Sequence, residues 1–216
     1  MLKLNYKKLL IKKNKIPITC LTAYSKPIAN ILDGKVDLIL VGDSLGTTLF
    51  GMQNTRGVTI EMMKNHGKTV VQNTKYSMTI IDMPYNTYRN KSEALKNARD
   101  ILAFTKADFI KIETDKKNLN IVEHLTKNKI NVVSHIGVTP QKYTNFSKIK
   151  SVGKNLKDSN NLLNLAKKLE EAGSKIIVLE CISLDTSKKI TNSLSIPTIG
   201  IGSSKYCDGQ VLVIDD

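Results

Sequence analysis

The chain has 216 residues, 41% of them hydrophobic and 24% charged, which is typical of one soluble globular domain spanning residues 1–216. The net charge is +14, but only three of the 33 basic residues are arginines, the residue that usually contacts phosphates and bases, so we expect no nucleic-acid partner. No apolar stretch approaches the roughly 20 residues of a membrane helix, no secretory signal is visible, and the three cysteines lack a metal-binding spacing. We therefore expect a cytoplasmic protein with buried free thiols and no membrane partner.

The predicted elements begin with an amphipathic helix within residues 4–13, which in a barrel would normally close the bottom. Eight short apolar runs follow, and their β-branched and aliphatic residues predict buried strands at 17–23, 37–44, 77–84, 108–113, 130–137, 175–181, 197–203 and 210–215. Residues 92–107 and 161–173 carry apolar residues at helical spacing, and Gly173 is a suitable helix terminator. This α/β alternation predicts a parallel sheet, and eight strands fit a closed (β/α)₈ TIM barrel better than an open sheet.

The end of the sequence predicts an exposed region on this barrel. The eighth predicted strand ends at Asp215 and the sequence ends at Asp216, so the helix that should follow strand eight is lacking. Strands eight and one should then expose apolar surface, which rarely stays bare in a monomer. We therefore expect a homo-oligomer.

Polar residues cluster at the carboxyl ends of the predicted strands, where the functional groups of such barrels lie. From the second to the sixth strand they are Asp43 and Ser44, Asp82, Lys111 and Glu113, His135, and Glu180. Lys111 and Glu113 are two residues apart and therefore share one face of their strand. Several neighbouring carboxylates need a cation, and hard oxygen ligands without a cysteine cluster suit Mg²⁺.

For three of these residues the local sequence supports a further statement. Asp43 taken alone would more often be a helix cap than a ligand. His135 ends a strand, and a functional role and a packing role are equally favoured. Glu180 follows the apolar run "KIIVL", and a carboxylate buried at the end of such a strand is costly without a partner.

The sequence resembles the ketopantoate hydroxymethyltransferase family over nearly its whole length. The stretches that carry the resemblance are "ITCLTAY", "DLILVGDSLG", "IIDMPY", "IKIE", "HIGVTPQ", "IIVLEC", "IPTIGIGS" and "CDGQVLV", in this order. The resemblance implies a Mg²⁺-dependent barrel of the phosphoenolpyruvate/pyruvate type. Such an enzyme makes ketopantoate from 3-methyl-2-oxobutanoate and 5,10-methylenetetrahydrofolate, the first committed step of pantothenate synthesis. It also implies a cytoplasmic homo-oligomer, commonly a decamer.

The resemblance implies a role for most of the polar residues. Asp43 and Asp82 would bind Mg²⁺, with Glu113 as a further ligand. The 2-oxo acid would be bound by Asp43, Ser44, Asp82 and Lys111. Glu180 would be the general base that removes the C3 proton, and Lys111 would offset negative charge on the acid or its enolate. His135 remains a further candidate.

Departures from the family pattern leave alternatives to this activity open. Ser25, Gly57 and Val152 stand where Asp, Pro and Gln are usual, and the family's C-terminal region is lacking. One alternative is a decayed, non-catalytic barrel, which the intact ionisable residues argue against. The other is a related Mg²⁺-dependent 2-oxo acid lyase or mutase, which "HIGVTPQ" and "CDGQVLV" argue against.

Overall fold

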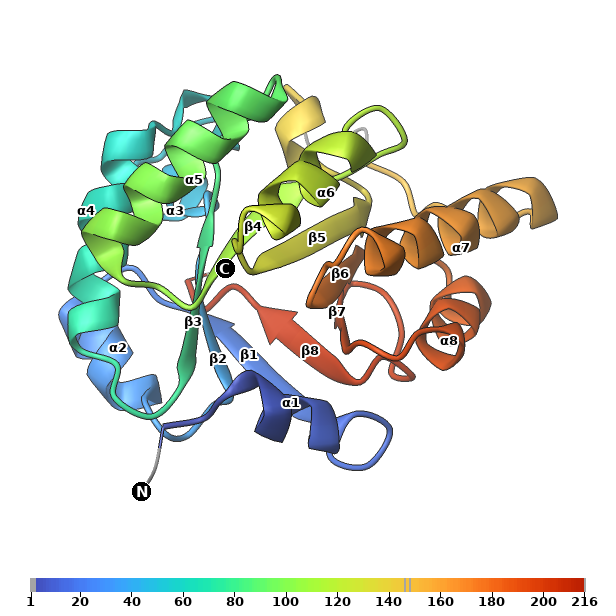
Figure 1. Ribbon diagram of the computed structural model, residues 1–216, viewed down its shortest axis with the longest axis horizontal. Helices are drawn as coiled ribbons and strands as arrows, with labels where there is room; N and C mark the ends of the chain where they lie inside the picture. The colour runs from blue at the N-terminus through green and yellow to red at the C-terminus, as the bar shows by residue number, and fades with distance from the viewer. Residues whose placement is uncertain (1–2, 146, 148, 216) are drawn as a thin grey trace.

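The computed structural model describes residues 3–145, 147 and 149–215, and its centre is a closed barrel of eight parallel strands in sequential order (Figure 1). The strands are β1 (Ile18–Thr22), β2 (Leu38–Val41), β3 (Met78–Asp82), β4 (Phe109–Glu113), β5 (Val132–Gly137), β6 (Ile176–Glu180), β7 (Thr198–Ile201) and β8 (Gly209–Leu212). Pairing between β1 and β8, with Ile18 opposite Gly209, closes the barrel. The predicted barrel and all eight of its strands are confirmed.

Helices connect most of the strands on the outside of the barrel (Figure 1). They are α2 (Lys26–Leu32), α3 (Leu45–Thr48), α4 (Ile60–Gln72), α5 (Lys91–Thr105), α6 (Leu119–Lys127), α7 (Leu156–Glu171) and α8 (Leu184–Ser193), with 3₁₀ turns η1 (Thr55–Gly57) and η2 (Pro140–Lys142). Residues 202–208 join β7 to β8 without a helix, and no helix follows β8 within the described residues. The outward side chains of β8 are consequently exposed, and Leu212 has an exposed fraction of 63%. None of the described helices is both long and apolar enough to cross a membrane.

Helix α1 (Tyr6–Lys12) closes the bottom of the barrel, as expected for the predicted segment 4–13. The Asn5 side chain caps it by accepting a hydrogen bond from the backbone N–H of Lys8 at 3.0 Å. Leu9 is fully buried in the apolar cluster that fills the barrel interior. The ring of Tyr6 packs edge-on against Phe109 in the same cluster, with 6.3 Å between ring centroids. The helix therefore plugs the N-terminal opening rather than covering β8.

Side-chain alternation along the strands decides what points into the barrel. The lower interior is apolar and includes Ile18, Leu38, Met78, Phe109, Val133, Ile176, Ile199 and Val211. Above it, the same alternation brings ionisable side chains inward: Asp82, Lys111, Glu113, His135 and Glu180. Outward-facing side chains form a second apolar cluster with the helices. The interior is thus sealed below and polar at its carboxyl end.

A repeated pair of polar residues joins neighbouring strands at the bottom of the barrel. A threonine in one strand donates its backbone N–H and its hydroxyl to an aspartate that precedes the next strand. These Thr–Asp pairs are Thr19–Asp37, Thr79–Asp108 and Thr198–Asp208. Each aspartate also accepts from a lysine of the N-terminal segment, at 2.6, 2.9 and 2.8 Å from Lys12, Lys3 and Lys13. The segment around α1 is therefore attached to three strand pairs by ion pairs.

Candidate active site

A cavity of about 400 Å³ opens at the carboxyl ends of the strands. Every residue predicted for the site lines it: Asp43, Ser44, Asp82, Lys111, Glu113, His135 and Glu180. Apolar side chains of β2, β6, β7 and β8 complete its wall. The cavity is therefore a concave site with a few convergent charged groups, the usual form of a small-molecule site.

Asp82 and Lys111 form a buried ion pair across β3 and β4. The two residues are directly opposite each other in the sheet register, and Lys111 Nζ donates to Asp82 Oδ1 at 2.6 Å. Burial alone would lower the pKa of Lys111, but the Asp82 and Asp43 carboxylates outweigh it, so this pKa is raised. Lys111 is therefore a permanent positive charge in the cavity wall.

Asp43 lies just after β2, where its backbone contacts β3 and its side chain contacts η2. Its backbone N–H donates to Asp82 Oδ2 at 3.0 Å, and its Oδ2 accepts from Gln141 Nε2 at 2.7 Å. Burial, followed by the neighbouring charge of Asp82, raises the pKa of Asp43 to about 7. The N-cap of α3 is Ser44 rather than Asp43, so the helix-cap interpretation of Asp43 is wrong. The Ser44 hydroxyl is hydrogen-bonded to the Tyr24 hydroxyl at 2.6 Å.

Glu113 has one satisfied and one unsatisfied oxygen. Its Oε1 accepts from the backbone N–H of Gln141 at 3.0 Å, whereas Oε2 is buried and has no hydrogen-bond partner among the described residues. Only 6% of the residue is exposed. Burial is the main cause that raises the pKa of Glu113 to about 8, and the charge of Asp43 adds to it. An unpaired buried oxygen of this kind indicates a missing cation or donor.

Glu180 ends β6 at the mouth of the cavity and faces His135 of β5. His135 Nε2 lies 3.1 Å from Glu180 Oε2, but the contact lacks the direction of a hydrogen bond, and within the described chain both ring nitrogens are buried without a partner. The Glu180 side chain has an exposed fraction of 17%. Glu180 is therefore only partly buried, because the last residue of the strand reaches the open end of the barrel.

Gln141 is a site residue that the sequence reasoning missed. The chain leaves β5 through Gly137, whose φ of +100° suits glycine, and a Cβ there would collide with the backbone carbonyl oxygen of Glu180. Pro140 then begins η2, which brings Gln141 between Asp43 and Glu113. Gly137 and Pro140 in "HIGVTPQ" predict a turn after β5, but they do not predict which residues Gln141 contacts.

The carboxylates fit a Mg²⁺ ion that also takes ligands from water and substrate. Among the described residues, no three Asp, Glu, His or Cys side chains form a complete metal cluster by themselves. Lys111 holds one oxygen of Asp82, and Gln141 holds one oxygen each of Asp43 and Glu113. Mg²⁺ usually keeps several waters and takes only one or two protein carboxylates with substrate oxygens. The unpaired Oε2 of Glu113 and the raised pKa of Asp43 are consistent with such a partly built site.

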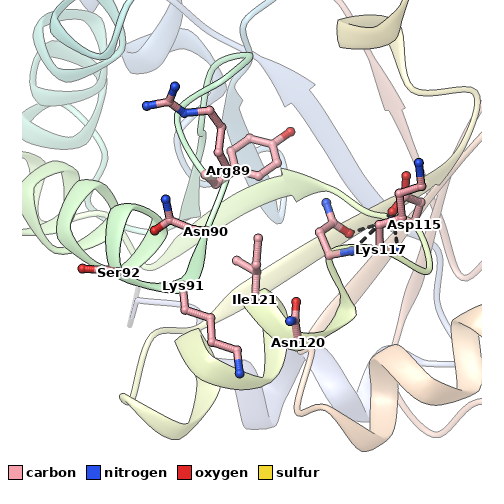
Figure 2. A pocket seen from close by; sticks show the side chains of 10 residues that line it. Arg89, Asn90, Lys91, Ser92, Asp115, Lys117, Asn120 and Ile121 are labelled. Atoms are coloured by element: carbon pink, nitrogen blue, oxygen red, sulfur yellow. Dashed lines mark hydrogen bonds between the residues drawn. The ribbon is translucent and has the colours of Figure 1, made fainter.

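A wider surface depression of about 630 Å³ lies between the segments that lead into α5 and α6. Figure 2 shows Arg89 and Lys91 on one side of it and Asp115 and Lys117 on the other. None of the predicted site residues lines it, and Arg89 is already paired with Glu93 at 2.6 Å. The smaller cavity in the barrel is therefore the candidate active site.

The residues that depart from the family pattern lie outside the cavity lining. The residues that line the cavity do not include Ser25, Gly57 or Val152. Val152 does donate its backbone N–H to the carbonyl oxygen of Cys181 at 2.9 Å, directly beside Glu180. All three cysteines are free, but Cys181 is only half-buried, so the expectation of buried thiols is wrong for this residue.

Solved structures share the barrel fold. Phosphonopyruvate hydrolase superposes with a TM-score of 0.73 and 10% identity, covering 99% of this chain and 80% of that one. 2,3-Dimethylmalate lyase, a member of the PEP mutase/isocitrate lyase superfamily, gives a TM-score of 0.70 and 11% identity, covering 96% and 80%. At these identities the likeness shows the fold alone, which is the same closed barrel.

Sequence comparison identifies the family. A family model described as ketopantoate hydroxymethyltransferase matches residues 3–216. The 3-methyl-2-oxobutanoate hydroxymethyltransferase of Pelagibacter ubique is 51% identical over 205 residues, which cover 95% of this chain and 79% of the relative. The enzyme of the same name from Anaplasma marginale is 42% identical over 205 residues, covering 95% and 74%. With a family model over nearly all of its length and relatives at these identities, the chain belongs to the ketopantoate hydroxymethyltransferase family.

Proposed function

We propose that the chain catalyses hydroxymethyl transfer to C3 of 3-methyl-2-oxobutanoate, which gives ketopantoate in the first step of pantothenate synthesis. Family membership supports the overall reaction. The cavity supports its first half, the removal of the C3 proton from a 2-oxo acid. The proposed donor of the one-carbon unit is 5,10-methylenetetrahydrofolate, and the proposed metal is Mg²⁺.

The surplus of negative charge in the cavity is the observation that carries this proposal. Four carboxylates line it, from Asp43, Asp82, Glu113 and Glu180, whereas its wall holds one permanent positive charge, Lys111. Burial is the main cause that raises the pKa of Asp43 to about 7 and that of Glu113 to about 8. The uncompensated negative charge of neighbouring carboxylates adds to it. A divalent cation would compensate this charge.

The residues around that cation have distinct roles in the proposal. Asp43, Asp82 and Glu113 hold Mg²⁺, which when bound polarises the keto group of the substrate and makes its C3 proton more acidic. Lys111 neutralises Asp82 and directs its remaining N–H donors at negative charge on the 2-oxo acid. The Ser44 hydroxyl, held by Tyr24, is a further donor to the substrate.

Glu180 is the proposed general base for the C3 proton. It lies at the mouth of the cavity, where the substrate carbon must also meet the incoming one-carbon unit. His135 lies beside it, and an Nε2–H directed at the carboxylate would hold Glu180 in place. The electron pair left at C3 then forms a bond to the methylene carbon of the folate, and water supplies the hydroxyl oxygen. The two bonds from that carbon to nitrogen break, and tetrahydrofolate leaves after its nitrogens take up two protons, equivalent to the one lost from C3 and one from water.

The test is hydrogen–deuterium exchange at C3 of 3-methyl-2-oxobutanoate in D₂O, with Mg²⁺ and without folate. The wild-type chain should catalyse the exchange, and Glu180→Gln should lower its rate by about 10²–10⁴ while the acid still binds. Glu171→Gln makes the same chemical change at an exposed position of α7 and should exchange at the wild-type rate. Exchange at the wild-type rate in Glu180→Gln would exclude Glu180 as the base.

The same assay separates the alternatives. A non-catalytic barrel would give no Mg²⁺-dependent exchange, whereas a lyase or mutase would consume the acid or its relatives without needing folate. A lyase and a mutase with this fold, 2,3-dimethylmalate lyase and phosphoenolpyruvate phosphomutase, are 11% and 10% identical to the chain. A cytoplasmic homo-oligomer remains part of the proposal, and its mass in solution, measured by light scattering, tests the assembly.

A further inference from the structure

Gln141 contacts two of the three carboxylates that we propose as metal ligands. Its side-chain Nε2 donates to Asp43 Oδ2 at 2.7 Å, and its backbone N–H donates to Glu113 Oε1 at 3.0 Å. The residue has an exposed fraction of 3%. It stands behind the cavity wall, in a narrow pocket that Glu113 also lines. Gln141 therefore joins these two carboxylates from outside the lining of the active-site cavity.

The hydrogen bonds of the Gln141 amide allow only one orientation. Nε2 also donates to the backbone carbonyl of Met83 at 3.0 Å, so both of its N–H groups face acceptors. Oε1 accepts from the Tyr88 hydroxyl at 2.5 Å. A flipped amide would direct Oε1 at the carbonyl and the carboxylate, both of which are acceptors. The donor side of the amide is thus fixed toward Asp43.

Tyr88 supports this orientation from the loop between β3 and α5. Its ring is half-buried beside Gln141, and its hydroxyl is the hydrogen-bond partner of Oε1. Burial, followed by the charges of Glu113 and Asp43, raises the pKa of Tyr88, so the hydroxyl keeps its proton. Removing that hydroxyl would leave Oε1 without a donor and would loosen the amide.

The contacts of Gln141 leave one oxygen of each carboxylate available. Glu113 Oε2 is buried without a partner, and Asp43 Oδ1 accepts no hydrogen bond from the described residues. We infer that Gln141 is a positioning residue of the metal site: with Tyr88 behind it, it holds Asp43 and Glu113 so that each presents its free oxygen to a divalent cation. This inference rests on the proposed Mg²⁺ site.

Two variants separate this role from simple packing. Gln141→Met keeps the length of the side chain and removes the amide. Tyr88→Phe removes only the hydroxyl behind it. Tyr6→Phe is the matched control, because its hydroxyl donates to the Lys175 carbonyl at 2.8 Å at the opposite end of the barrel.

The experiment measures the affinity of the whole chain for Mn²⁺ alone by electron paramagnetic resonance, together with the melting temperature of each variant. Loss of a residue that orients metal ligands typically weakens binding 10–100-fold, and we expect a loss of about this size in Gln141→Met. Tyr88→Phe should weaken binding in the same direction by a smaller factor. Tyr6→Phe should bind Mn²⁺ as the wild type does. A change in affinity at an unchanged melting temperature is the result that a packing role would not produce.

Wild-type Mn²⁺ affinity in a folded Gln141→Met variant would overturn the inference. If this variant does not fold, Tyr88→Phe decides: an affinity equal to that of Tyr6→Phe overturns the inference, and a weaker one supports it. If the wild-type chain itself binds no Mn²⁺, the proposed metal site fails, and the positioning role of Gln141 fails with it. A wrong metal site is therefore seen in the wild-type chain itself, whereas a wrong role for Gln141 is seen only in the variants.

Discussion

Asp82 and Lys111 neutralise each other in the cavity wall, so the surplus negative charge of the site comes from its other carboxylates. The two side chains of this pair are almost fully buried, and the Nζ–Oδ1 distance is 2.6 Å. A buried pair of this kind adds little stability compared with apolar residues, but losing one partner leaves an uncompensated charge. The pair therefore makes the fold sensitive to a change at either residue.

Lys111→Met should destabilise the metal-free protein by about 3–5 kcal/mol, because Asp82 is then buried without its cation. Urea unfolding measures this free energy. Lys127→Met is the matched control: Lys127 pairs with Glu123 at 2.6 Å on the exposed face of α6, and its loss should leave the midpoint unchanged. Equal midpoints for the two variants would contradict the assigned importance of the buried pair.

Asp43 and Glu113 should make the effect of Mg²⁺ on stability depend on pH. Without metal, their pKa values in the folded chain are about 7 and about 8, above the values near 4 of unfolded chains. Between these values the folded chain binds more protons than the unfolded chain, so the free energy of unfolding falls as pH rises. Mg²⁺ requires the deprotonated carboxylates and binds better at the upper end of this range.

The rise in melting temperature on replacing EDTA by Mg²⁺ should therefore be larger at pH 8 than at pH 6. Differential scanning calorimetry at both pH values measures it. A double variant, Asp43→Asn with Glu113→Gln, should lose most of the difference between the two pH values. The same increment at pH 6 and pH 8 in the wild type would show that these two groups do not control metal binding.

Among the secondary-structure elements, α1 is attached by ion pairs of unequal burial. The Lys13 and Asp208 side chains have exposed fractions of 7% and 1%, against 46% and 20% for Lys3 and Asp108. Lys13→Met should therefore cost about 3 kcal/mol of unfolding free energy. Lys3→Met should cost roughly 0–1 kcal/mol. Urea unfolding of both variants provides the comparison, and a larger loss in Lys3→Met would contradict it.

The sequence predicts the strands of the barrel well because a run of apolar residues is a local signal. Each buried strand is visible as a short apolar run, and Asp82, Lys111 and Glu113 stand out as ionisable residues at or near the ends of these runs. The prediction of α1 succeeds for the same reason, since its apolar side is visible within residues 4–13. These features need no knowledge of distant contacts.

Features that depend on distant contacts could not be predicted in this way. Gln141 acquires its role because the chain after β5 passes close to the end of β6, and its partner Asp43 is 98 residues away. The exposure of Glu180 likewise depends on where the mouth of the cavity opens.

At the scale of the whole molecule, the pairing of β1 with β8, here called the seam, closes the barrel. β1 and β8 pair along their length, the Ile18 backbone N–H donates to the Asp208 carbonyl at 2.9 Å, and the Lys13–Asp208 ion pair joins residues 195 positions apart. The other adjacent strands pair over much shorter separations, such as Ile110 of β4 with Asn131 before β5 at 3.0 Å. The pairing of β1 with β8 therefore has the largest entropic cost of loop closure of all the strand pairings.

This seam also has a consequence for synthesis of the chain on the ribosome. Until β8 has emerged, β1 and β7 are open edges, and open edges invite pairing with other chains. Pulsed hydrogen exchange during refolding should show protection of the Ile18 amide after that of Ile110. Simultaneous protection would mean that closure is not the last step. With late closure, the nascent chain is open to aggregation and to chaperone binding until β8 has emerged from the ribosome.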